Sequence, residues 1–110
     1  MRLTADVPRA AAASRGEVTY EVRSGSVTAA GALTWAPKAV GHSLANFAHL
    51  RSSLAERYPS VGVLPLPDAP SLFFGNSESA LAARRQELTS FLQAALREPG
   101  VVRGIGRILK

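Results

Sequence analysis

Apolar and polar residues alternate strictly over residues 17–23. The apolar positions of this stretch are Val18, Tyr20 and Val22. A period of two residues is typical of a strand that buries one face, so we expect a half-buried strand here. Two further strands are expected over residues 3–8 and 32–41, which would complete a three-stranded antiparallel sheet. Pro37 cannot donate a ladder hydrogen bond and therefore places the last strand at a sheet edge or marks a bulge.

From residue 44 onward the apolar residues recur at steps of three and four, which is typical of amphipathic helices. Two long helices are predicted, over residues 44–57 and 78–97, and a short C-terminal one over residues 101–109. Ser43 is placed to cap the first helix. The residues expected in the core between sheet and helices are Phe47, Leu88 and Phe91.

A proline-rich segment from Val61 to Pro70 separates the two long helices. Pro65, Pro67 and Pro70 exclude a helix there and favour extended chain. The flanking apolar residues indicate that the segment packs against the domain, although Pro67 and Pro70 also have the spacing of an SH3 ligand. Strands that precede helices indicate an α+β fold. We therefore expect a single domain over residues 1–110, in which a three-stranded antiparallel sheet packs on a helical layer with a proline-rich crossover between helices.

Composition excludes several classes of protein. The chain has no cysteine, two histidines and one methionine, which rules out a disulfide framework and leaves little material for a metal site. No stretch approaches the ~20 apolar residues of a membrane-spanning helix. A cytoplasmic location is the expectation. Residues 1–16 hold three arginines and a run of four alanines, which leaves a short organelle transit peptide as an alternative.

The net charge is +5, and 11 of the 13 cationic residues are arginines. The planar guanidinium group binds phosphate with two hydrogen bonds, so this composition favours anionic partners, either acidic lipid headgroups or nucleic acid. Nucleic acid is disfavoured because few aromatic residues are available to stack bases and no groove-reading motif is present. A genome rich in alanine and arginine would give the same composition, and the chain has 19 alanines.

The most informative single residue is Arg84, which falls within the apolar stripe of the second long helix, between Leu81 and Leu88. Arg85 lies on the shoulder of the same stripe. A buried arginine must reach water, a carboxylate or a ligand, because burying it without a partner is costly. The helical spacing leaves all three open.

No catalytic site is expected. His42 and Ser43 are neighbours in sequence, and neighbours do not normally present a nucleophile to its base. The glycines at positions 104 and 106 do not complete a dinucleotide-binding fingerprint. We therefore expect that the protein is not an enzyme and that it binds neither a cofactor nor a metal ion.

Taken together, the chain from about Val7 to its C-terminus resembles a phox-homology (PX) domain, the phosphoinositide-binding module of sorting nexins and oxidase subunits. The best section covers residues 80–92 and is similar to the family's third-helix pattern of Arg, three residues, Leu, two residues and an aromatic. Further sections that resemble the family are residues 17–22 (second strand), 54–59 (end of the first helix), 64–70 (proline-rich crossover) and 74–76 (Phe-Gly-Asn). Their fixed order and spacing make the combination specific.

The lipid-binding signature of the family, Arg-Arg-Tyr-Ser-Asp-Phe, should end at Phe47. This chain instead has Ser43 where the family places the arginine that grips the 3-phosphate, and Leu44 in place of the tyrosine that stacks on the inositol ring. The lysine that usually meets the 1-phosphate after the prolines is not evident. Only Arg84, which in the family bonds the inositol hydroxyls, is retained by residue type.

The resemblance implies a membrane-recruitment module that binds phosphoinositide headgroups weakly or with atypical specificity, peripherally on endosomal membranes. The lipid-binding residues that it implies are Arg84 and Ser43, with Arg85, His42 and Lys38 as further sources of charge, and Leu72 and Phe73 as membrane contacts. The alternative for Phe73 is that its side chain is buried in the core instead of contacting the membrane. The alternative function is a PX-like protein-interaction domain that has lost lipid binding and uses the proline-rich segment.

Overall fold

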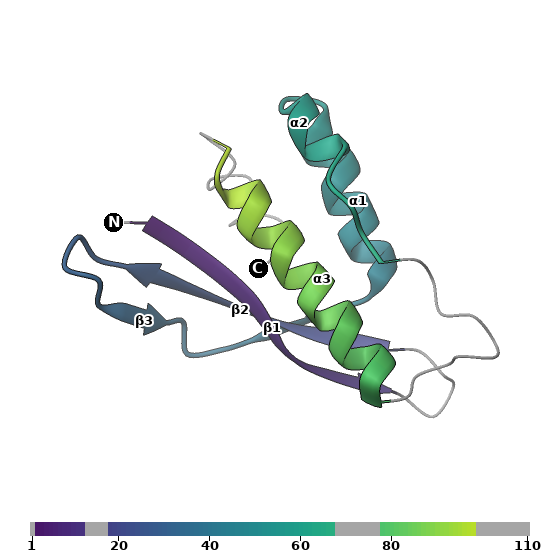
Figure 1. Cartoon of the computed structure of the whole chain (residues 1–110), viewed down its shortest axis with the longest axis horizontal. Helices are drawn as coiled ribbons and strands as arrows, with labels where there is room; N and C mark the ends of the chain where they lie inside the picture. Colours follow the sequence, from purple (N-terminus) through teal and green to yellow (C-terminus); the bar gives the residue numbers. More distant parts are fainter. Residues whose placement is uncertain (1, 13–17, 68–77, 99–110) are drawn as a thin grey trace.

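The computed structural model of the chain describes residues 2–12, 18–67 and 78–98, and it has the expected α+β class (Figure 1). The strands within these ranges are β1 (Arg2–Ala12), β2 (Val18–Val27), β3 (Leu33–Trp35) and β4 (Val40–His42), all paired antiparallel. The helices are α1 (Leu44–Ala55), α2 (Pro59–Gly62) and α3 (Glu78–Leu96). The helix predicted over residues 101–109 lies outside the described residues.

β2 is the central strand of the described sheet. β1 pairs along one side of β2, and both β3 and β4 pair along the other. The prediction of one strand over residues 32–41 is therefore wrong, because residues 36–39 interrupt it and its two halves pair with different parts of β2. Pro37 explains the interruption, since it lacks the amide hydrogen that a continuous ladder needs.

β1 is longer than predicted and continues past Pro8. Its register against β2 shifts between Asp6 and Arg9, which marks a bulge in β1. A bulge is one of the few positions in a strand where proline is tolerated, because the ladder is already disrupted there. The bulge therefore lets a proline sit inside β1 without ending it.

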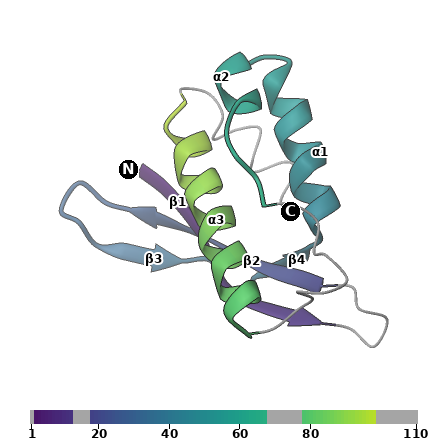
Figure 2. The ribbon, with the colours of Figure 1, turned by 45° about the vertical axis from the view of Figure 1, so that its right-hand side comes forward.

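The helices cover one face of the sheet, with α3 lying along β1 and α1 beside it (Figures 1 and 2). α1 begins where predicted, and the Ser43 hydroxyl accepts a hydrogen bond from the backbone N–H of Asn46 at 3.2 Å, which confirms the cap. α2 differs from the prediction, which had extended chain from Val61. It is a single turn that begins at Pro59. Proline is favoured at the first position of a helix because its fixed φ angle matches the helical value.

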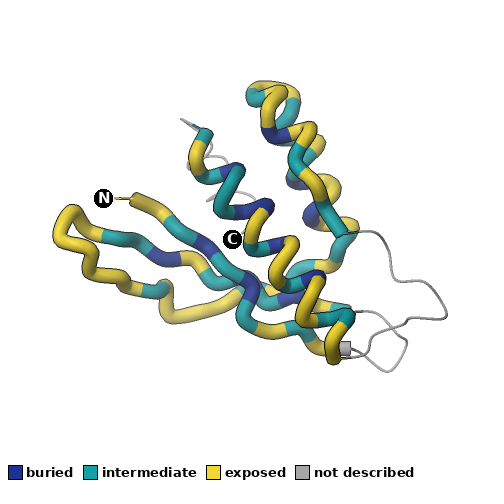
Figure 3. The backbone as a smooth tube through the Cα atoms, in the orientation of Figure 1, coloured by how far each residue is buried: buried dark blue, intermediate teal, exposed yellow. Residues whose placement is uncertain are grey.

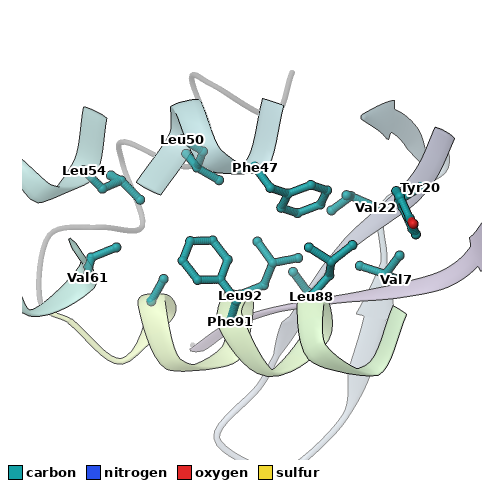
Figure 4. Close-up of a cluster of buried hydrophobic side chains, with 12 residues drawn as sticks. Val7, Tyr20, Val22, Phe47, Leu50, Leu54, Val61, Leu88, Phe91 and Leu92 are labelled. Atoms are coloured by element: carbon teal, nitrogen blue, oxygen red, sulfur yellow. The ribbon is translucent and has the colours of Figure 1, made fainter. Parts of the chain in front are cut away.

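The core lies between this helical layer and the sheet (Figure 4). Phe47, Leu88 and Phe91 are each at most 2% exposed, as predicted. They pack with buried residues from β1, β2, α1, α2 and α3. Figure 3 shows buried residues along β1, β2, α1 and α3, and exposed residues over the β2–β3 hairpin. No helix in the described ranges is long and apolar enough to cross a membrane.

Candidate functional site

Figure 2 shows the start of α1 beside β4 and the start of α3 near the end of β1, and both lie toward the half of the sheet where β1 ends and β2 begins. His42, at the end of β4, pairs with Tyr20 near the start of β2, and α1 follows directly. In the first half of α3, Arg85 contacts Pro8 at the bulge of β1. Segments about forty residues apart in sequence therefore reach one end of the domain.

Ser43 and His42 are both engaged by the first turn of α1. The Ser43 hydroxyl caps the helix. The Nδ1 atom of His42 lies 3.3 Å from Nδ2 of Asn46, and its ring meets Phe47 edge-on with 6.2 Å between centroids. Nε2 of His42 is buried and has no hydrogen-bond partner among the described residues. These contacts hold both residues to the helix and leave them few polar atoms for a ligand.

Arg84 is the charged residue that the described part of the chain buries, with 9% of its surface exposed. It occupies the same face of α3 as Leu88 and Phe91, which the helical spacing predicted. Arg84 also has an interaction within the chain. A cation in this position is strongly desolvated, so its contacts with anions are stronger than those of a surface arginine.

Arg85 contacts the edge of β1 as the first of three polar side chains spaced four residues apart on α3. Nη1 of Arg85 donates to the carbonyl oxygen of Pro8 at 2.6 Å, the hydroxyl of Thr89 accepts from the backbone N–H of Val7 at 3.0 Å, and Nε2 of Gln93 donates to the carbonyl oxygen of Ala5 at 2.6 Å. This polar stripe on α3 was not predicted from the sequence. Polar residues at positions i, i+4 and i+8 were the available signal, because they share one side of a helix.

The other residues predicted to bind lipid or membrane are Lys38, Leu72 and Phe73, and the structure brings none of them into a described site. Lys38 is exposed in the loop between β3 and β4. Leu72 and Phe73 lie outside the described residues.

The proline-rich segment is fixed to the helical layer at its start. Nη1 of Arg51, on α1, donates to the carbonyl oxygen of Leu64 at 2.9 Å, and Leu64 and Leu66 pack against the core. The described part of the segment therefore packs on the domain, as expected. The contribution of Arg51 was not predicted, because nothing in its spacing pairs it with a backbone carbonyl thirteen residues away.

A cavity of about 400 Å³ lies between this segment and α3. Its lining residues are Pro65, Ala83, Gln86, Glu87 and Ser90. Glu87 places a carboxylate in its wall, which disfavours a phosphate ligand. Arg84 is not among these lining residues. The cavity is therefore distinct from the headgroup site that the family resemblance implies at Arg84, and that site stays a prediction.

Arg23 lies on the face of the sheet away from the helices, since it alternates with buried Val22 along β2. Its Nε and Nη2 atoms donate to the two carboxylate oxygens of Asp6 at 2.9 and 2.6 Å, and its guanidinium carbon lies 3.7 Å from the centroid of the Trp35 ring. Hydrogen bonding to Asp6 raises the pKa of Arg23 above its usual value. This cation therefore lies on the face of the sheet opposite to the helices and the predicted ligand residues.

The described residues contain no cluster of histidine and carboxylate side chains suited to a metal ion.

Comparison with known proteins agrees with the observed fold. The family model described as PX domain matches residues 36–103. Among solved structures, the chain is similar to one titled "X-ray structure of a designed CISK-PX domain", with 24% sequence identity over 90% of this chain and 87% of that one, and a TM-score of 0.60. That likeness concerns the fold. No curated protein matches the sequence.

Proposed function

The chain belongs to the PX domain family, and from this premise we propose that it is a non-enzymatic module that attaches peripherally to membranes containing phosphoinositides. PX domains are generally phosphoinositide-binding modules that recruit proteins to membranes. In this proposal the present chain also binds phosphoinositides, with weak affinity or an atypical preference among headgroups, and it does so on endosomal membranes, as a sorting nexin would.

The buried cation Arg84 is the observation that supports the proposal most directly. By residue type it is the one member of the PX family's ligand set that the resemblance finds in this chain. Its helix, α3, packs over the half of the sheet where α1 also begins. Its desolvated guanidinium can form charge-assisted hydrogen bonds with a headgroup. Because Arg84 already interacts within the chain, a headgroup would share or displace that partner.

The state of Ser43 and Leu44 supports weak binding. The Ser43 hydroxyl is used as the cap of α1, and Leu44 is half-buried against the core. Neither supplies the phosphate clamp or the flat aromatic ring that the family signature would place there. A lost arginine–phosphate contact costs about 1.5–3 kcal/mol, which corresponds to roughly tenfold to a hundredfold in affinity.

Other residues take supporting roles in this proposal. Lys38 adds charge near the start of α1, where His42 also lies, and Leu72 and Phe73 contact the bilayer. Arg85 has its Nη1 atom committed to Pro8, so it would reach a headgroup only through its remaining donors. Binding of this kind is sensitive to salt, because exposed charges are screened within about 10 Å at 0.1 M ionic strength.

The second candidate function is a PX-like protein-interaction domain that has lost lipid binding. The role of Ser43 as the N-cap of α1 favours this function, because the residue at the position of the phosphate clamp is already used to stabilise the helix. The proline-rich segment would then carry the interaction.

Sedimentation with liposomes that each contain one phosphoinositide, at fixed salt, separates the two functions. We expect weak binding that Arg84→Ala abolishes and that Arg57→Ala, an equal loss of charge at an exposed site beyond α1, leaves nearly unchanged. Equal losses in both variants would indicate attraction by net charge alone. No binding to any liposome would favour the protein-interaction function.

A further inference from the structure

The two edges of the sheet are treated differently. On the β1 edge, backbone groups that point away from β2 are bonded by Arg85, Thr89 and Gln93 from α3. A bulge and Pro8 interrupt the same edge. Such devices keep an edge strand from pairing with another chain.

The β3 edge has no comparable cover among the described residues. Ala32 accepts from Thr28 and Ala36 donates to Ser24, so the even-numbered residues of this strand bond β2. Because backbone groups alternate in an antiparallel ladder, the N–H and C=O groups of Leu33 and Trp35 point outward. Leu33 is 50% exposed, and the β2–β3 hairpin extends away from the helices (Figures 1 and 3).

The hairpin also differs from the rest of the chain in charge. Residues 24–37 contain no charged residue, whereas the chain as a whole carries a net charge of +5. Natural edge strands commonly carry a lysine or another charge that blocks pairing. Two copies of this chain repel each other through their net charge, but the hairpin adds no unpaired like charge where they meet. The Arg23 guanidinium that stacks on Trp35 is paired with the carboxylate of Asp6.

We propose that β3 pairs antiparallel with β3 of a second copy of this chain, around a two-fold axis at Thr34. In this register Leu33 lies opposite Trp35 of the second copy, and each such pair exchanges two backbone hydrogen bonds. Leu33 and Trp35 also share one face of their strand, so an aliphatic and an aromatic side chain face each other on both sides of the axis. The arrangement is self-complementary, as a two-fold interface requires.

The ladder is short, so the association is weak. β3 comprises only three residues, and the contact stays well below the ~1,200 Å² of a stable interface. A dimer would nevertheless present two lipid sites at once, and linked weak sites bind a membrane more tightly than either alone.

Disulfide trapping tests the register. The chain has no cysteine, so Thr34→Cys introduces its one thiol. Across the proposed axis the two substituted positions form a non-hydrogen-bonded pair, with Cα atoms about 4.5 Å apart, a separation that a disulfide spans. The control is Ala30→Cys, which is also exposed but lies in the turn outside the ladder. We expect Thr34→Cys to form disulfide-linked dimers at least about tenfold faster than the control, and equal rates would overturn the proposal.

Sedimentation equilibrium of the unmodified chain provides an independent measurement. Between about 10 µM and about 1 mM we expect reversible dimerisation that Leu33→Lys removes and Ala30→Lys retains. The two variants add the same charge to the same hairpin, once on the pairing edge and once off it. A strictly monomeric wild-type chain over this range would refute self-pairing, and it would leave the β3 edge to a strand of another protein.

Discussion

Arg84 and Arg85 are neighbours in sequence with different surroundings. Arg84 is buried on the core face of α3, while Arg85 bonds the carbonyl oxygen of Pro8. The apolar stripe predicted the position of Arg84, since that position depends only on helical spacing. The contact of Arg85 was not predictable in this way, because it depends on a bulge in β1 that lies 77 residues away in sequence.

Arg85→Ala should destabilise the domain by about 1–3 kcal/mol, because the Pro8 carbonyl loses its partner in a half-buried place. Arg85→Lys should recover part of this loss, since lysine keeps a donor of similar reach. Urea denaturation measures both. A free energy of unfolding unchanged by Arg85→Ala would show that water replaces the guanidinium at no cost.

Phe91→Ala should cost roughly 3–5 kcal/mol, because the removed ring leaves a cavity among fully buried residues. Ser90→Ala, on the exposed side of the same turn, is the matched control and should change stability by less than about 0.5 kcal/mol. Thermal unfolding of the two variants gives the comparison. Similar melting temperatures for both would mean that the Phe91 stripe does not form the core.

Local signals in the sequence predicted the long elements and failed on the short ones. α1 and α3 each combine a helical apolar period with a clear start. α2 has four residues, which is too short to show a period, and the prolines around it favoured extended chain. Pro37 indicated an edge or bulge, but whether the strand resumes after it is decided by pairing of β4 with β2, a long-range contact.

Restoring the family signature at the start of α1 should raise lipid binding and lower stability together. Ser43→Arg with Leu44→Tyr supplies a phosphate clamp and an aromatic ring, so binding to liposomes containing phosphatidylinositol 3-phosphate should increase at least about tenfold. The same change removes the cap, which costs about 0.5–2 kcal/mol.

Ser43→Ala separates these two effects. It removes the cap without adding a ligand and should match the loss of stability with no gain in binding. If the double variant binds no better than Ser43→Ala, the headgroup does not sit at the start of α1.

The fold class of the whole molecule followed from the order of the hydrophobic periods along the chain. A two-residue period typical of strands comes before the three- and four-residue steps typical of helices, and strands that precede helices permit few arrangements. The site was less accessible to such reasoning. That His42 and Ser43 lie in the same half of the sheet as Arg84 depends on the pairing of β4 with β2 and on the contacts of α3 with β1. Helical and strand spacing cannot join these segments, and it was the resemblance to the PX family that connected them.

The location of headgroup binding tests the central claim most directly. Titration with a water-soluble, short-chain phosphatidylinositol 3-phosphate, followed by amide chemical shifts, detects weak binding and reports where it occurs. We predict saturable shifts that cluster at the start of α1 around Ser43 and in the first half of α3 around Arg84, that disappear in Arg84→Ala and that spare the β2–β3 hairpin. Shifts confined to other regions, or none at millimolar ligand, would contradict phosphoinositide recognition at this site.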